Sequence, residues 1–215
     1  MNGTSQIVPL GDKAMLVRFG STMDDGANRQ AQALARSLLF DPIDGALEVV
    51  PSLVSVLVRY DPGKIAPARL AGEISLRLTE RANVDAVLHR VGVRFGGVDG
   101  PDLDEVAASL GLSPAEFIKQ HCAVPLRILA TGFAPGFVYC GFHPSALNVP
   151  RRQQVRTRVP MGSVLFAAGQ TAIAATDIPT GWHVIGRTDF RNFDTACMPP
   201  TRLAAGDMVM FEALE

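Results

Sequence analysis

The sequence predicts an α+β protein in which an N-terminal α/β domain is followed by a C-terminal β-barrel or sandwich. Strand-like and helix-like segments alternate through roughly the first 95 residues. Gly and Pro then cluster at positions 96–101, which indicates a linker and places the two domains at residues 1–96 and 97–215. Beyond Ala123, short β-rich runs are separated by Gly and Pro, a pattern typical of all-β domains.

The N-terminal domain is predicted to contain four strands and two helices. Apolar and β-branched runs indicate strands at residues 14–19, 47–50, 55–60 and 87–95. Apolar residues at helical spacing indicate one helix through 27–38, opened by Thr22 and Asp25, and a second through 70–78. The order β-α-β-β-α-β is that of a ferredoxin-like unit. Because that fold supports many unrelated functions, it predicts no chemistry by itself.

The C-terminal domain is predicted to begin with two short helices and to continue as strands. The first helix covers residues 102–110 and is ended by Gly111. The second begins at Ser113, with Pro114 at the first helical position and Glu116 at the third, which is the pattern of a capping box. β-Rich runs then indicate strands at 125–129, 163–166, 171–175, 182–187 and 208–211.

Composition argues against several classes of protein. Hydrophobic residues make up 47% and charged residues 19%, which indicates a globular chain and not a disordered one. With 20 Lys+Arg against 21 Asp+Glu, the net charge of -1 gives no support to nucleic acid as a partner. Three cysteines form no CxxC pair, and no secretory signal is visible at the N-terminus, so we expect a reduced, cytoplasmic protein.

A long uncharged run covers residues 128–150, which contain no Asp, Glu, Lys or Arg. Its length would suffice to span a bilayer, but repeated Gly and Pro residues would break a spanning helix. We therefore expect no membrane segment and no membrane partner. The run is expected to form turns and short strands under a pocket or an interface, because an apolar stretch on a free surface usually marks a contact with a partner.

Arginine is concentrated in the second half of the chain. Residues 127–187 hold six arginines, no lysine and a single acid, Asp177, which gives a local net charge of about +5. The planar guanidinium group binds a carboxylate or phosphate through two parallel hydrogen bonds. Anion recognition is the favoured interpretation, while contact with an acidic partner and a plain solvated face remain alternatives. The six are Arg127, Arg151, Arg152, Arg156, Arg158 and Arg187.

Residues 132–137 read Gly-Phe-Ala-Pro-Gly-Phe, a loop in which glycines would allow backbone N–H groups to approach a ligand. On spacing alone, a tight corner with Phe133 and Phe137 as core anchors is slightly favoured. The loop is no nucleotide-binding motif, because the chain has neither a GK[ST] triplet nor a GxGxxG turn between a strand and a helix.

Histidines supply the candidates for acid–base chemistry. His143, in the uncharged loop, and His183, beside Trp182, are the better candidates for a general acid or base. His121 ends a predicted helix, where capping explains it. No His, Cys or acidic cluster has metal-ligand spacing, and no GxSxG motif is present.

An ordered set of motifs resembles one family over nearly the whole chain. The family is that of the B subunit of bacterial 5-oxoprolinase, also called allophanate hydrolase subunit 1, which includes the Kip-type kinase inhibitors. The main motifs are Gly132-Phe133-Ala134-Pro135-Gly136-Phe137-Val138-Tyr139, Pro150-Arg151-Arg152, Thr157-Arg158-Val159-Pro160-Met161-Gly162-Ser163-Val164, Gly169-Gln170-Thr171 and Gly181-Trp182-His183-Val184-Ile185-Gly186-Arg187-Thr188.

The resemblance implies a C-terminal cyclophilin-like β-barrel and membership of an ATP-dependent complex that opens 5-oxoproline to glutamate, or acts on a related small amide such as allophanate or urea. It implies a larger homologous partner, which is the C subunit of 5-oxoprolinase (allophanate hydrolase subunit 2), and a third component, the A subunit. ATP and Mg²⁺ would be requirements of the complex, with none bound by this chain alone. The alternative within the family is a regulatory protein that inhibits a sensor histidine kinase.

With this resemblance, we expect a site that binds a small amide or lactam bearing a carboxylate. The arginines would hold the carboxylate, and the glycine loop would shape the site. Candidates for catalysis are His183 and Gln170, and candidates for substrate binding are Gly132, Phe133, Gly136, Arg151, Arg152, Arg158, Thr171, Trp182 and Arg187.

Overall fold

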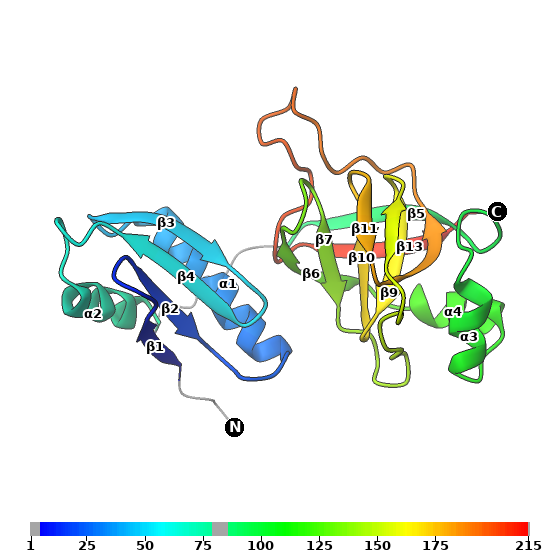
Figure 1. Cartoon of the computed structure of the whole chain (residues 1–215), viewed down its shortest axis with the longest axis horizontal. Coiled ribbons are helices and arrows are strands. Elements are labelled where there is room, and N and C mark those ends of the chain that lie inside the picture. The colour runs from blue at the N-terminus through cyan, green and yellow to red at the C-terminus, as the bar shows by residue number, and fades with distance from the viewer. Residues whose placement is uncertain (1–4, 79–85, 215) are drawn as a thin grey trace. The chain divides into compact units, whose positions relative to one another are not determined.

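The computed structural model describes residues 5–78 and 86–214 (Figure 1). Its contacts divide the chain into two units, Met1–Asp85 and Ala86–Glu215, each with its own hydrophobic core. The sequence placed the boundary later, between residues 96 and 97. The predicted class, an α+β chain with a small α/β unit before a β-barrel, is confirmed.

The first unit is a four-stranded antiparallel sheet with two helices packed on one face (Figure 1). Its elements are β1 (Gln6–Pro9), β2 (Ala14–Arg18), α1 (Asp25–Phe40), β3 (Ala46–Pro51), β4 (Ser55–Tyr60) and α2 (Pro67–Arg77). The order across the sheet is β1-β2-β4-β3. Alternate residues of β4, Val56 and Val58, are buried against the helices because successive strand side chains point to opposite faces.

The N-terminal prediction was wrong about the fourth strand. The edge beside β2 is occupied by β1, which sequence analysis missed, and the strand predicted at 87–95 belongs to the second unit. Its alternating pattern correctly indicated a strand, but periodicity does not specify which strands pair. The start of α1 also differs, since the N-cap is Asp24, whose carboxylate accepts a hydrogen bond from the Ala27 N–H (2.9 Å).

The second unit is a closed seven-stranded barrel with two helices and a small two-stranded sheet. Strand order around the barrel is β10-β7-β6-β13-β5-β12-β9, and β9 pairs with β10 to close it. The β5–β13 pair is parallel and the other pairs are antiparallel. The elements are β5 (Leu88–Phe95), α3 (Leu103–Ser109), α4 (Pro114–His121), β6 (Leu126–Thr131), β7 (Val138–Gly141), β8 (Arg156–Val159), β9 (Ser163–Ala167), β10 (Gln170–Ile173), β11 (Ile178–Thr180), β12 (His183–Arg187) and β13 (Met208–Ala213).

Inward-facing side chains from every part of the barrel form its core, among them Val91, Val164 and Phe211. Helices α3 and α4 lie together beside the barrel and add Val106 and Phe117 to that core (Figure 1). The capping box predicted at the start of α4 is confirmed. Strands β8 and β11 are not predicted by the sequence, and β7 is predicted only as one of the unplaced short strands of the uncharged run, because each is short and lies within a stretch rich in Gly, Pro or Arg.

The uncharged run at 128–150 is mainly barrel interior. It forms β6, β7 and the loop after them, and Ile128, Val138 and Leu147 are fully buried in the core. The lack of charge therefore reflects burial within this chain, and it no longer argues for a contact with a partner. Within residues 5–78 and 86–214, we find no helix with the length and apolar character needed to cross a bilayer.

Candidate functional site

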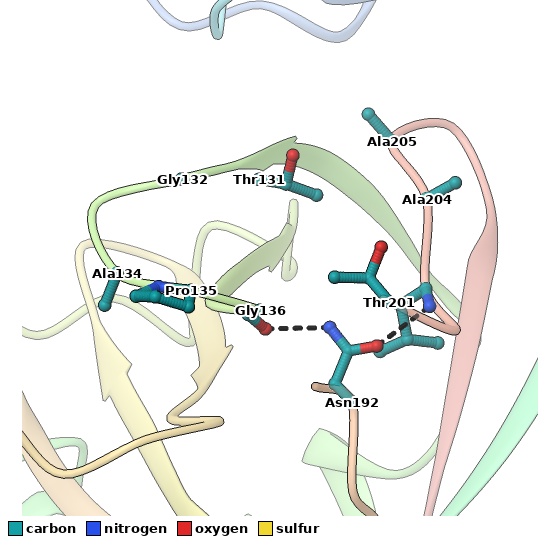
Figure 2. A pocket seen from close by; sticks show the side chains of 10 residues that line it. Thr131, Gly132, Ala134, Pro135, Gly136, Asn192, Thr201, Ala204 and Ala205 are labelled. Atoms are coloured by element: carbon teal, nitrogen blue, oxygen red, sulfur yellow. Dashed lines mark hydrogen bonds between the residues drawn. The ribbon is translucent and has the colours of Figure 1, made fainter. Parts of the chain in front are cut away.

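The loop between β6 and β7 forms one wall of a pocket of about 410 Å³ (Figure 2). Segment 201–205, which precedes β13, forms part of the opposite wall. The lining residues are Thr131, Gly132, Ala134, Pro135, Gly136, Asn192, Thr201, Leu203, Ala204 and Ala205. The pocket thus contains two of the predicted residues, Gly132 and Gly136. None of its lining residues carries a charge, so this pocket offers no arginine to a carboxylate.

Glycine is required at position 136 by both conformation and space. Gly136 has φ +68°, and a Cβ there would lie 2.6 Å from Phe193 Cβ and 2.8 Å from Ala175 Cβ. Phe133, with φ +75°, shares the left-handed region although it has a side chain, and it is 68% exposed. The loop therefore projects Phe133 outward while its other end is held against the barrel.

Asn192 connects the two walls of the pocket, as Figure 2 shows. Its Nδ2 donates to the Gly136 carbonyl (2.7 Å), and its Oδ1 accepts from the Leu203 N–H (2.8 Å) and the Arg202 N–H (3.2 Å). Asn192 is buried and uses both ends of its amide. Sequence analysis missed this residue, because a single Asn between β12 and β13 belongs to no motif.

A row of aromatic rings continues from the same loop along the outside of the barrel. Ring centroids are 5.5 Å apart for Phe133–Phe137, 4.8 Å for Phe137–Tyr139 and 5.9 Å for Tyr139–Trp182, all in edge-to-face geometry. Phe137 and Trp182 belong to a cluster separate from the barrel interior. The row brings together two predicted residues, Phe133 and Trp182, that are far apart in the sequence.

Arg151 lies at the Trp182 end of the aromatic row. Its guanidinium carbon is 5.7 Å from the centre of the Trp182 ring, which is within the range of a cation–π contact. The neighbouring backbone is fixed, since the Arg152 N–H donates to the Gly181 carbonyl (2.7 Å) and His183 Nε2 lies 3.1 Å from the Pro150 carbonyl oxygen. A carbonyl only accepts, so His183 donates there, and the predicted catalytic ring holds the loop.

Arg152 and Arg156 both bind Asp102, the residue that precedes α3. Arg152 donates to one carboxylate oxygen (2.8 Å), Arg156 donates to both, and the Val184 N–H adds a further bond (2.7 Å). Burial alone would raise the pKa of Asp102, but these hydrogen bonds and the two positive charges hold it below its ordinary value. Two of the six arginines therefore neutralise a buried acid that the sequence analysis had assigned only to a helix start.

Arg158 pairs with Asp177 at the surface and is 76% exposed. A backbone bond from Met161, followed by the bonds from Arg158, lowers the pKa of Asp177. Arg187 lies close enough to Asp177 and Asp189 to lower the pKa of both carboxyl groups as a minor contribution. The predicted arginines are thus distributed over separate contacts and are not gathered at one site.

Thr171 is fully buried inside the barrel with two histidines. His121 Nε2 and His143 Nε2 each lie 2.8 Å from Thr171 Oγ1, and the two rings are 4.8 Å apart. Burial lowers the pKa of His143 to about 4, and burial followed by the nearby His143 lowers the pKa of His121 well below its ordinary value. Both rings are neutral at physiological pH. His121 is therefore a core residue, and the interpretation as a helix cap was wrong.

Gln170, the other candidate for catalysis, is also buried, at the start of β10. Its Nε2 has no hydrogen-bond partner among the described residues. Thr171 and Gln170 thus lie away from solvent, as do Phe137 and Trp182 of the aromatic row, whereas the glycine loop, Tyr139 and Arg151 are accessible.

The fold and these motifs define the family. Residues 5–203 match the family model for the carboxyltransferase domain, subdomain C and D, and the chain belongs to this family. It is 35% identical to the 5-oxoprolinase B subunit of Bacillus subtilis (strain 168), over 96% of this chain and 91% of that protein. It is 31% identical to the 5-oxoprolinase B subunit of Escherichia coli O157:H7, over 94% of this chain and 93% of that protein. The resemblance inferred from the motifs is confirmed.

Solved structures agree with the fold. The crystal structure of TTHA0988 matches with a TM-score of 0.85 and 35% identity over 94% of this chain. This chain spans only 40% of that longer one. A conserved uncharacterized protein from Pyrococcus horikoshii matches with a TM-score of 0.58 and 34% identity, over 98% of both chains.

Proposed function

We propose that this chain is the B subunit of a 5-oxoprolinase complex, which opens the lactam of 5-oxoproline to glutamate in an ATP-dependent reaction. The observation that carries this proposal is the 35% identity to the B subunit of a 5-oxoprolinase across nearly the full length of both proteins. Similarity of this extent covers both units and all the site motifs.

The geometry supports a role in positioning the substrate. The accessible elements are the loop with Gly132, Phe133 and Gly136, the half-buried ring of Tyr139, and Arg151. The candidates for proton transfer have other contacts: His183 donates to a backbone carbonyl, and His121 and His143 face Thr171 inside the barrel. We therefore assign substrate contact to the accessible group and structural roles to Gln170, Thr171 and His183.

The remaining chemistry would be supplied by the partner chains. The complex would contain the C subunit and a third component, the A subunit, would work in the cytoplasm, and would require ATP and Mg²⁺ as a whole. This chain would contribute a folded barrel surface to that assembly.

The proposal is tested by co-expressing the chain with C-subunit and A-subunit homologues from the same genome and measuring glutamate formed from 5-oxoproline with and without ATP. We expect ATP-dependent turnover from the complete complex and none from this chain alone. An inactive complex in which every component is folded and associated would contradict the proposal. Inhibition of a sensor kinase by the isolated chain would instead favour the regulatory alternative.

A further inference from the structure

We propose that Arg151, which lies over Trp182, is a carboxylate-binding subsite on the outer face of the barrel, and that the half-buried ring of Tyr139 beside it contacts the ring of the same ligand. The ligand class is a small cyclic amide that bears a carboxylate. The identity of this ligand rests on the proposed function, whereas the carboxylate subsite itself rests on the geometry of Arg151.

Arg151 is available in a way that its neighbours are not. Arg152 and Arg156 bind Asp102, and Arg158 binds Asp177. Arg151 is exposed and has no acidic partner within residues 5–78 and 86–214. Its guanidinium therefore retains donors for a carboxylate, in a region where arginines outnumber acids.

The backbone on both sides of Arg151 is held in place before a ligand arrives. On one side the Pro150 carbonyl accepts from His183, and on the other Arg152 binds the Gly181 carbonyl through its backbone and Asp102 through its side chain. The guanidinium carbon lies over the Trp182 ring, 5.7 Å from its centre, so a cation–π contact favours this position of the group. A fixed donor loses less conformational entropy on binding than a freely rotating one.

Tyr139 supplies the second part of the subsite. Tyr139 lies between Phe137 and Trp182. Burial raises the pKa of its hydroxyl group, and the nearby positive charge of Arg151 partly opposes that rise. Phe137 and Trp182 are buried, so Tyr139 presents the partly exposed aromatic surface next to the cation, which suits a ligand with a ring and one negative charge. Asp102, which fixes the segment carrying Arg151, is a positioning residue for this subsite.

The chain contains a single tryptophan, so Trp182 fluorescence reports directly on this position. The first experiment titrates the full-length chain with 5-oxoproline and with 2-pyrrolidinone, the same lactam without a carboxylate. We expect a saturable change in emission with 5-oxoproline, and binding of 2-pyrrolidinone that is weaker by about tenfold or more. No change with 5-oxoproline, or equal affinity for the two lactams, would overturn the proposal.

Variants distinguish a specific role of Arg151 in ligand binding from a general effect of positive charge on the surface. Arg151→Gln should weaken 5-oxoproline binding by about tenfold or more and raise the KM of the complex with a smaller effect on kcat, and Arg151→Lys should restore binding only in part. The matched control is Arg90→Gln, which removes an exposed arginine of the barrel already paired with Glu212 and should leave both measurements unchanged. Wild-type binding and KM in Arg151→Gln would refute the subsite.

The two proposals fail in different ways. Normal 5-oxoproline turnover by an Arg151→Gln complex would retain the proposed function and eliminate the subsite. Binding that requires both Arg151 and the ligand carboxylate, together with an inactive wild-type complex, would retain the subsite and eliminate the proposed reaction. Thermal melting of Arg151→Gln should stay close to that of the wild type, because the variant loses a contact between an exposed arginine and the Trp182 ring and no ion pair among the described residues.

Discussion

At the scale of single residues, the same amino-acid type has very different roles according to its surroundings. Arg151 and Arg152 are adjacent in sequence, yet one lies over an aromatic ring and the other binds a buried carboxylate. Asp102 has the residue type of a helix N-cap, but its side chain makes no capping bond and serves the two arginines. The residue type limits which interactions a side chain can make, and the residues that it contacts determine which of them it makes.

Gly136→Ala should destabilise the barrel through backbone strain and overpacking together. Gly111→Ala is the matched control, because Gly111 has φ +71° and nothing within 4 Å of the added Cβ. We expect Gly111→Ala to lose about 1–2 kcal/mol of unfolding free energy from strain alone, and Gly136→Ala to lose about 1–3 kcal/mol more. Urea unfolding of both variants measures the difference. Equal losses would show that Phe193 and Ala175 move at no cost in stability to accommodate the added Cβ.

The histidines within the barrel predict a loss of stability in acid. Burial lowers the pKa of folded His143 from 6.5 to about 4, so the unfolded chain binds the proton first as the pH falls. The contribution of neutral His143 to the unfolding free energy is fully present above about pH 6.5 and is lost by about pH 4. For His143 alone we expect a loss of about 3 kcal/mol over that interval.

Unfolding free energies measured from pH 7 to pH 4 would test this, with His143→Gln as the comparison. The variant has no imidazole at this position, so its stability should fall less steeply as the pH decreases. If the unfolding free energy of both proteins has the same pH dependence, His143 takes up a proton as readily in the folded chain as in the unfolded chain.

At the scale of elements, one buried carboxylate connects three segments. Asp102 lies at the start of α3, accepts from the N–H of Val184 in β12, and binds two arginines of the 150–156 segment and β8. The spacing of these residues in sequence gives no sign of the contact. The connection fixes the loop that carries Arg151, so a structural ion pair supports the candidate subsite.

Asp102→Asn should leave two guanidinium groups without their counter-charge. Because Asp102 is buried while both arginines are partly exposed, we expect a loss of about 2–4 kcal/mol, toward the lower end for a broken buried pair. Asp177→Asn is the control, since it disrupts an exposed pair and should have a much smaller effect. Thermal or urea unfolding of the two variants would decide, and similar losses would contradict the special role of Asp102.

At the scale of the whole molecule, strand β5 determines where the barrel unit begins. It pairs in parallel with β13 over six residue positions and also contacts β12, so it closes the barrel between them. A fragment of residues 86–215 should therefore fold with native-like near-ultraviolet dichroism and cooperative melting. A fragment of residues 97–215 lacks β5, leaves two strand edges open, and should not. Cooperative melting of the shorter fragment would show that β5 is dispensable.

The sequence by itself determined the fold class, most strand positions, the capping box of α4 and the family, because these depend on local periodicity and contiguous motifs. It also identified Gly132, Gly136, Arg151 and Trp182 as candidates. Only the tertiary structure decided that β5 joins β13, that Arg152 and Arg156 neutralise Asp102, and that Thr171 faces His121 and His143. These outcomes depend on contacts between residues tens of positions or more apart. Burial and charge in the folded chain determine such pairings, and local sequence patterns do not record them.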